Sequence, residues 1–219
     1  MCGRFTLTAP EELLADTFGL DAAPALSPRY NVAPTQAIAV VREPAEGAPR
    51  SLGFLTWGSV RPSKGLRRGP LVINVRSEGL GGSSAFGEAF ALRRCLVPAD
   101  GFYEWTGVRS SRRPYYLRLR DGRPFGFAAL WEPGNPGSCV ILTTGANELV
   151  RELHPRMPVI LAPDDHRRWL APCTPRSALA GVCRPYPAGD MTAYPVGGQV
   201  GDPRVDTPDC IRRVATLFD

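Results

Sequence analysis

The chain has 219 residues, which is enough to bury a hydrophobic core without help from disulfides or metals. Its composition, with 43% hydrophobic and 21% charged residues, is that of an ordinary globular protein. No apolar run approaches the ~18 residues of a membrane span. The polar start is unlike a signal peptide, so we expect a cytoplasmic protein with no membrane partner.

The charged residues and the cysteines indicate which kinds of binding site the chain can form. The net charge is +5, and of the 26 basic residues only Lys64 is a lysine. Arginine codons in a GC-rich genome would explain this excess, and so would phosphate binding, because the planar guanidinium fork suits phosphates. The six cysteines form no CxxC pair and there are only two histidines, so we expect no metal site. Thiols other than that of Cys2 are expected to be mostly small buried side chains.

The first half of the chain predicts short elements. Residues 8–20 are typical of a helix in which Thr8 and Glu11 form a capping box and Gly19 marks the end. Residues 27–41 form a proline-punctuated loop that leads into a strand, and residues 51–60 form another strand. A loop rich in glycine, arginine and proline then reaches Pro70. Alternation predicts a strand over 70–78, and a short helix is expected over 85–94.

The second half of the chain also predicts short strands and short helices. Residues 95–105 are two short apolar runs around a Pro-Ala-Asp-Gly turn, and residues 114–131 predict a hairpin with Asp121 and Gly122 at its tip. A buried strand over 138–147, a helix capped by Asn147 and a buried strand over 156–163 follow. Short helices are expected over 164–170 and 174–182, and the tail from Arg184 is expected to be mostly irregular.

Many short strands without a regular βαβ rhythm predict an α+β fold. We expect a single domain over residues 1–219, with a mostly antiparallel, barrel-like β core flanked by short helices.

Two polar side chains share one face of the strand predicted over 70–78. Leu71, Ile73 and Val75 alternate onto the opposite face, which leaves Asn74 and Arg76 together. An amide and a guanidinium two residues apart suit a site that positions a ligand and binds a phosphate. The alternative is an ordinary strand edge facing solvent.

Other polar residues stand next to apolar segments. Glu104 lies among aromatic residues, which predicts a raised pKa and a general acid or base; a surface glutamate is the alternative. Trp105 is either a core residue or a ring that stacks on a nucleic-acid base. His154 is held extended by Pro155 and either shuttles protons or serves structurally. His166 opens a charged helix and is expected at the surface.

These residues lie within segments that form a recognisable series. In chain order the segments are "MCGRF", "RYNVAPTQ", "NVRSE", "RRCLVPADGFYEW", "FAALW", "LTTGAN" and "HPRMPVIL", with "YPVGGQV" and "DTPDCI" in the tail. The series resembles the SOS response-associated peptidase (SRAP) family of abasic-site-processing proteins. It covers nearly the whole chain and implies the SRAP fold.

The resemblance implies a chemistry for the start of the chain. Family members lose the initiator methionine, and the exposed cysteine, here Cys2, links covalently to an abasic site in single-stranded DNA. A terminal amine with a pKa of about 8 is partly unprotonated at pH 7, so it can form a Schiff base with the open-chain sugar aldehyde. The neighbouring thiol then closes a thiazolidine ring that shields the lesion. Elimination from the imine would give a weak lyase activity.

The resemblance also implies residue roles. Asn74 would orient the amine, Glu104 would transfer protons and open the sugar ring, and His154 would assist at the sugar hydroxyl. The DNA-binding positions would be Arg4, Arg76, Arg156, Trp105, Pro34 and Thr144. No cofactor is implied. The expected partner is single-stranded DNA that carries an abasic site, bound by a monomer that associates with the nucleoid.

One segment departs from the family, and two other functions stay open. A second tryptophan is expected about ten residues after "WG" and is absent, so a basic cluster would bind DNA backbone instead: Arg61, Lys64, Arg67 and Arg68. One alternative is a thiol peptidase that uses Cys2, Glu104 and His154, with Asn74 as oxyanion donor, and removes its own Met1. The other is a non-covalent binder of single-stranded or modified DNA.

Overall fold

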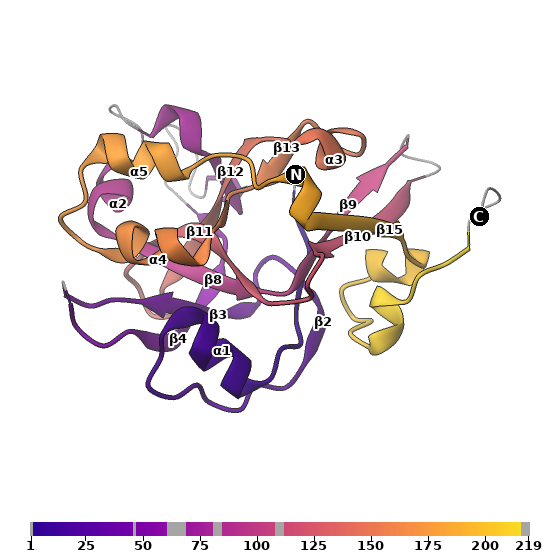
Figure 1. Cartoon of the computed structure of the whole chain (residues 1–219), viewed down its shortest axis with the longest axis horizontal. Helices are drawn as coiled ribbons and strands as arrows, with labels where there is room; N and C mark the ends of the chain where they lie inside the picture. Colours follow the sequence, from indigo (N-terminus) through magenta and orange to yellow (C-terminus); the bar gives the residue numbers. More distant parts are fainter. Residues whose placement is uncertain (1, 46, 61–68, 81–84, 108–111, 216–219) are drawn as a thin grey trace.

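The computed structural model describes residues 2–45, 47–60, 69–80, 85–107 and 112–215. The predicted α+β class is confirmed, because short strands dominate and short helices flank them (Figure 1). The strands form a five-stranded sheet, a larger eight-stranded sheet and a two-stranded pair, β5 (Ser59–Val60) with β6 (Leu71–Val72). The basic cluster from Arg61 to Arg68 lies outside the described residues.

The five-stranded sheet is antiparallel throughout and has the order β15-β10-β9-β1-β2. Its strands are β1 (Phe5–Leu7), β2 (Arg29–Val32), β9 (Gly101–Thr106), β10 (Arg113–Leu119) and β15 (Met191–Pro195). β1 pairs with β9 through Phe5 and Phe102, so the start of the chain lies beside β9. The tail from Arg184, predicted to be mostly irregular, contributes β15 as an edge strand of this sheet.

The larger sheet closes on itself, which confirms the barrel-like core. The closed ring consists of β3 (Ala37–Arg42), β4 (Ser51–Trp57), β8 (Arg94–Ala99), β11 (Phe125–Glu132) and β12 (Ser138–Gly145). In the order β4-β3-β8-β11-β12 neighbours pair antiparallel, and β12 returns to β4 by a parallel pairing of Cys139 with Trp57. Three short strands extend it: β7 (Asn74–Arg76) and β13 (Arg156–Pro158) pair with β12, and β14 (Ile160–Leu161) pairs with β11.

Alternation along these strands separates an inner from an outer hydrophobic cluster. On β11, Phe127 belongs to the inner cluster, which also contains Cys2 and Phe5, whereas Leu130 belongs to the outer one. Side chains from four helices complete the outer cluster: α1 (Glu11–Phe18), α2 (Gly87–Leu92), α4 (Pro163–Leu170) and α5 (Arg176–Val182). In Figure 1 these helices lie on the side of the molecule away from β9, β10 and β15. Cys2 is therefore buried between the two main sheets.

Local helix signals were partly correct. Gly19 follows α1 in the left-handed conformation with φ 62°, and the Asn147 side chain accepts a 2.9 Å hydrogen bond from the Val150 amide at the start of α3 (Glu148–Arg151). The capping box is wrong, because the Thr8 hydroxyl donates to the Asp100 carboxylate at 2.8 Å instead. Asp100 lies far along the chain, so no local pattern could reveal this competing acceptor.

The predicted turn at residues 98–101 is confirmed and shows why it contains glycine. β8 ends at Ala99 and β9 begins at Gly101. A Cβ on Gly101 would lie 2.2 Å from the Tyr116 ring on β10, so only glycine allows this close approach. The turn thereby places β9, with Glu104, directly beside β10.

The hairpin predicted over 114–131 is wrong, although its turn is correct. Gly122 has φ 76°, and its amide donates to the Leu119 carbonyl at 3.2 Å. The two flanking strands do not pair with each other: β10 pairs with β9 and β15, whereas β11 pairs with β8, β12 and β14. The chain therefore crosses from one sheet to the other at this turn.

The strand predicted over 70–78 is interrupted at Ile73, which separates β6 from β7. Ile73 packs against the inner cluster, Val75 packs against the outer cluster, and Leu71 is 44% exposed, so the predicted common face of these three residues is wrong. Within β7 the alternation holds, and Asn74 and Arg76 share a face.

Candidate active site around Cys2

Cys2 is fully buried at the entrance to β1. Its side chain is 0% exposed and packs in the inner cluster, and its thiol contacts the Arg4 carbonyl at 3.6 Å. The Tyr103 amide on β9 donates to the Arg4 carbonyl at 3.0 Å, which continues the β1–β9 ladder toward the chain start. The first residues are thus held along β9 rather than projecting freely.

Asn74 is the residue that fixes the Cys2 backbone. Its Nδ2 donates a 2.8 Å hydrogen bond to the Cys2 carbonyl oxygen. Its Oδ1 is buried and has no hydrogen-bond partner in the described part of the chain, so it can accept from an N–H group that reaches it. β7 brings Asn74 here because it pairs in parallel with β12 opposite Ile141. The structure therefore brings Asn74 and Cys2 together, and the role of Asn74 toward the amine stays a prediction.

Glu104 is buried on the same side of β9 as the inner cluster. It is only 2% exposed, and burial raises its pKa from 4.5 to about 7. A carboxyl with this pKa gains and loses a proton easily near neutral pH, which is what a general acid or base requires. The burial excludes the alternative of a surface glutamate.

The electrostatic link between Glu104 and Cys2 places them in one site. Burial raises the pKa of the Cys2 thiol far above its usual range, and the nearby negative charge of Glu104 raises it further. The thiol is therefore neutral at physiological pH. It can react as a thiolate only after a base has taken its proton.

His154 lies between α3 and β13, and the Arg156 backbone holds its ring. Nδ1 lies 3.0 Å from the Arg156 amide nitrogen and 3.1 Å from its carbonyl oxygen. A deprotonated Nδ1 accepts from the amide, and a protonated Nδ1 donates to the carbonyl, so both states have a partner. Burial lowers the pKa of His154, which keeps the ring neutral at pH 7 and suits a proton acceptor.

The arginines predicted to bind DNA flank the same strands. Arg76 on β7 is exposed and lies opposite Thr143 of β12. Arg156 begins β13 on the other edge of β12 and donates to the Thr143 carbonyl at 2.6 Å. Arg4 is half-buried and donates to the Gly201 carbonyl at 3.3 Å. β12 thus holds Arg76 and Arg156 close together.

The other residues predicted to contact DNA are Trp105, Thr144 and Pro34. Trp105 lies on the opposite face of β9 from Glu104 and packs with Tyr103, their ring centroids 6.3 Å apart. Thr144 on β12 is only 5% exposed. Pro34 lies in the turn between β2 and β3. Val32, at the end of β2, is paired with Phe5, at the start of β1, so this turn lies toward the Cys2 end of β1. Of these three, Pro34 lies toward the Cys2 end, whereas Trp105 faces away from Glu104.

One expectation outside this site is wrong. His166 is 1% exposed rather than at the surface, and its ring stacks on Phe18 at a centroid distance of 5.5 Å. Burial lowers its pKa to about 4. Among the other cysteines, Cys173 is exposed and Cys183 is half-buried, whereas Cys95, Cys139 and Cys210 are buried as expected. In the part of the chain that the structure describes, no three acidic, histidine or cysteine side chains cluster to hold a metal ion.

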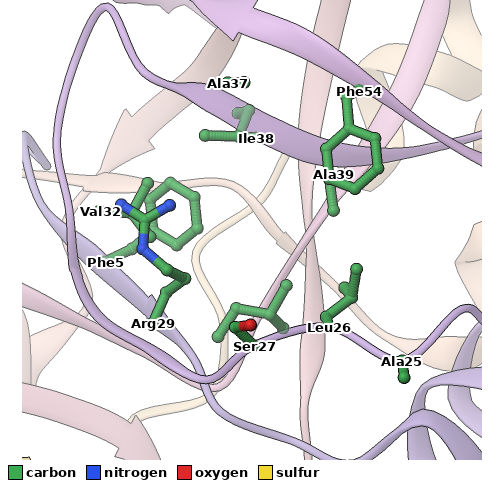
Figure 2. A pocket seen from close by; sticks show the side chains of 11 residues that line it. Phe5, Ala25, Leu26, Ser27, Arg29, Val32, Ala37, Ile38, Ala39 and Phe54 are labelled. Carbon is green, nitrogen blue, oxygen red and sulfur yellow. The ribbon is translucent and has the colours of Figure 1, made fainter.

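A separate apolar pocket of about 230 Å³ lies next to β1 and does not include the site residues. Figure 2 shows Phe5, Arg29 and Val32 on one side of it and Ile38 and Phe54 on the other. Asn74, Glu104 and His154 do not line it.

The sequence reasoning missed Glu78, two residues after Arg76. Its carboxylate forms a two-pronged ion pair with Arg156, with one arm at 2.8 Å. The sequence did show an acidic residue two positions after an arginine that was predicted to bind phosphate, and this could have drawn attention to Glu78. Only the fold, which places β7 and β13 on either side of β12, shows which arginine it meets.

The fold and site together define a class of α+β proteins in which an asparagine holds the backbone of a buried second-position cysteine, and a buried glutamate of the other sheet acts electrostatically on its thiol. A family model described as SOS response associated peptidase (SRAP) matches residues 1–203, and the chain belongs to this family. Abasic site processing protein YoqW of Bacillus subtilis is 37% identical, with 96% of this chain and 99% of that protein aligned. Abasic site processing protein YedK of Escherichia coli is 27% identical over 98% of this chain and all of its own length.

Solved structures show the same fold. A Bacteroides thetaiotaomicron protein aligns with 98% of this chain and 100% of its own at a TM-score of 0.80 and 20% identity. A phage-related protein from Bordetella bronchiseptica aligns with 89% of this chain and 94% of its own at a TM-score of 0.72 and 27% identity. None of the helices in the described ranges has the length and apolar character needed to span a membrane.

Proposed function

We propose that this protein processes abasic sites in single-stranded DNA by covalent capture at Cys2. Removal of Met1 would leave the Cys2 amine as the chain terminus. The observation that carries the proposal is the 2.8 Å hydrogen bond from Asn74 to the Cys2 carbonyl, because it fixes the residue whose amine must meet the sugar. The curated relatives named abasic site processing proteins support the same activity.

The proposed reaction has two covalent steps. The Cys2 amine adds to the open-chain sugar aldehyde, and loss of one water gives an imine. The Cys2 sulfur then adds to the imine carbon while the nitrogen takes up a proton, which closes a thiazolidine ring. Glu104, with a pKa of about 7, would accept the thiol proton and donate to the nitrogen. His154 would exchange protons with the sugar oxygen, and the imine would also permit slow strand cleavage by β-elimination.

The peptidase alternative is less well supported. A thiol peptidase needs a thiolate nucleophile, and burial raises the pKa of the Cys2 thiol instead of lowering it. An amine-first reaction does not need a thiolate at the start. We therefore treat self-removal of Met1 as a secondary activity of the same site.

Binding would come before capture. Arg4, Arg76 and Arg156 would contact phosphates that flank the lesion, while Pro34, Trp105 and Thr144 would contribute neighbouring contacts. We propose that the protein acts in the cytoplasm as a monomer and joins the nucleoid when bound to DNA.

The direct test mixes the mature protein with a single-stranded oligonucleotide that carries one abasic site. We expect a product that survives boiling in detergent, with the mass of protein plus oligonucleotide less one water. Cys2→Ala keeps a terminal amine, so it should give only an imine that borohydride can trap. Cys173→Ala changes an exposed cysteine away from the site and serves as the matched control.

Two results would reject covalent capture. One is a heat-stable product of equal yield from Cys2→Ala. The other is a product that forms equally on an intact oligonucleotide. Salt-sensitive binding without any adduct would instead support a non-covalent DNA binder.

A further inference from the structure

Arg156 has its guanidinium fork filled by a carboxylate from its own chain. Both terminal nitrogens of Arg156 donate to the two carboxylate oxygens of Glu78, and one also donates to the Thr143 carbonyl. The Arg156 side chain is 17% exposed and the Glu78 side chain is 53% exposed. The Arg156 guanidinium therefore points toward the surface, and its partner, the Glu78 carboxylate, is accessible to solvent.

A carboxylate and a phosphate present similar pairs of oxygens to a guanidinium. Both accept two parallel hydrogen bonds from the same fork, so one can replace the other without moving the arginine. The Thr143 carbonyl would keep the Arg156 stem in place during such an exchange. Because Glu78 is half-exposed, breaking its pair with Arg156 does not strand a buried charge.

Glu78 is also positioned by the strand that carries Asn74. It lies in the 3-10 turn over Ser77–Gly79, directly after β7. Arg156 and, more weakly, Arg76 lower the pKa of Glu78, so its carboxylate is charged at neutral pH and lies within the field of both arginines. A DNA strand that contacts Arg76 and Arg156 must pass this negative charge.

From this geometry we propose that Glu78 competes with DNA phosphate for Arg156 and so limits how long the protein stays on undamaged DNA. The inference rests on the proposed function of the site. Phosphate contacts bind damaged and intact strands alike, so every gain in phosphate affinity also strengthens binding to intact DNA. Glu78 weakens this uniform binding, while covalent capture at Cys2 supplies retention only where an aldehyde is present. The pair thus shortens the time that the protein spends on undamaged strands before it reaches a lesion.

The test compares Glu78→Gln, Glu78→Asp and wild type for binding to an intact single strand over a range of salt. Glu78→Gln should bind about two- to five-fold more tightly, which is the range that an exposed ion pair represents. Its slope of log affinity against log salt should steepen by about 0.7, as expected for one more phosphate neutralised on a single strand. Glu78→Asp keeps the charge and should return toward wild type.

A second arm measures release from intact DNA through capture. Protein already bound to the intact strand is mixed with excess abasic oligonucleotide, so that release from the intact strand limits adduct formation, and Glu78→Gln should form adduct about two- to five-fold more slowly. Glu88→Gln is the matched control. Glu88 is also an exposed carboxylate, and it pairs with Arg93 at 2.7 Å. Glu88 belongs to α2, which packs on the outer cluster away from the candidate site. Glu88→Gln makes the same change in net charge and should leave both readouts unchanged.

Unchanged or weaker binding by Glu78→Gln would overturn the inference, since it would mean that Glu78 holds Arg156 ready for phosphate. An effect of equal size in Glu88→Gln would also overturn it, since the cause would then be net charge. If wild type forms no adduct, the proposed capture fails, yet the salt-dependent binding arm still decides whether Glu78 competes at Arg156.

Discussion

Asn74 and Cys2 are 72 residues apart in the chain and are joined by a hydrogen bond of 2.8 Å from the Asn74 amide to the Cys2 carbonyl. The bond connects β7 of the larger sheet to the residues that enter β1 of the smaller one. It therefore fixes Cys2 relative to both sheets. The consequences can be tested one residue at a time.

Asn74→Ala should slow adduct formation by about 5- to 30-fold, which corresponds to one hydrogen bond of about 1–2 kcal/mol. Folding should be largely retained, because Asn74 is only partly buried. Single-turnover kinetics with an abasic oligonucleotide would measure the rate, and DNA affinity would be measured in parallel. A variant that captures at the wild-type rate would show that the bond does not orient the amine.

Glu104→Gln should slow adduct formation by about 100-fold or more, the usual effect of losing a general acid–base group. The amide keeps the shape of the side chain but cannot exchange a proton. Wild type should show an inflection near pH 7 in its rate profile, where Glu104 titrates, and the variant should lack it. An inflection that persists in Glu104→Gln would assign it to another group.

The same residue should make folding stability depend on pH in a particular direction. The pKa of Glu104 is about 7 in the folded protein, and its ordinary value of 4.5 applies to the unfolded chain. Between these two pH values the folded state therefore binds more protons than the unfolded state. The Glu104 contribution to stability should therefore be greatest below pH 4.5 and fall by up to about 3 kcal/mol as pH rises past 7. Denaturant titrations at pH 5 and pH 8 should show Glu104→Gln to be the more stable protein only at pH 8.

The two histidines should titrate below their ordinary range. Burial lowers the pKa of His166 to about 4 and lowers that of His154 as well. For His166 the unfolded state binds the extra proton, so this contribution to stability should be lost as pH falls from about 6.5 to 4. NMR titration can separate the two rings, because the chain has no other histidine. A His166 midpoint near 6.5 would contradict the buried, stacked position.

Asp100→Ala should destabilise the protein by about 2–4 kcal/mol, because several donors from residues 6–9 would lose a buried charged acceptor. The Asp100 carboxylate accepts from Thr6, Thr8 and the Ala9 amide, and so ties the segment around β1 to the turn between β8 and β9. Chemical denaturation would measure the loss. Asp164→Ala removes an exposed acid from the first turn of α4 and should cost less than about 1 kcal/mol. Equal losses in the two variants would contradict this role.

The sequence alone determined the features whose causes are local. Gly19 ends α1, Asn147 caps α3 and Gly122 turns the chain, because each depends on backbone conformation or on a hydrogen bond within a few residues. The apolar neighbours of Glu104 likewise predicted its raised pKa. The ordered segments predicted the family.

Only the tertiary structure decided which distant groups meet. The strands on either side of Gly122 joined different sheets, Thr8 found Asp100 instead of a capping partner, and His166 was buried against Phe18. Glu78 met Arg156 because β12 lies between their strands. Turn and capping signals act over a few residues, whereas strand pairing and side-chain burial depend on the free energy of the whole packed core. For that reason the residues of the candidate site could be named from the sequence, whereas the contact of Glu78 with Arg156 could not.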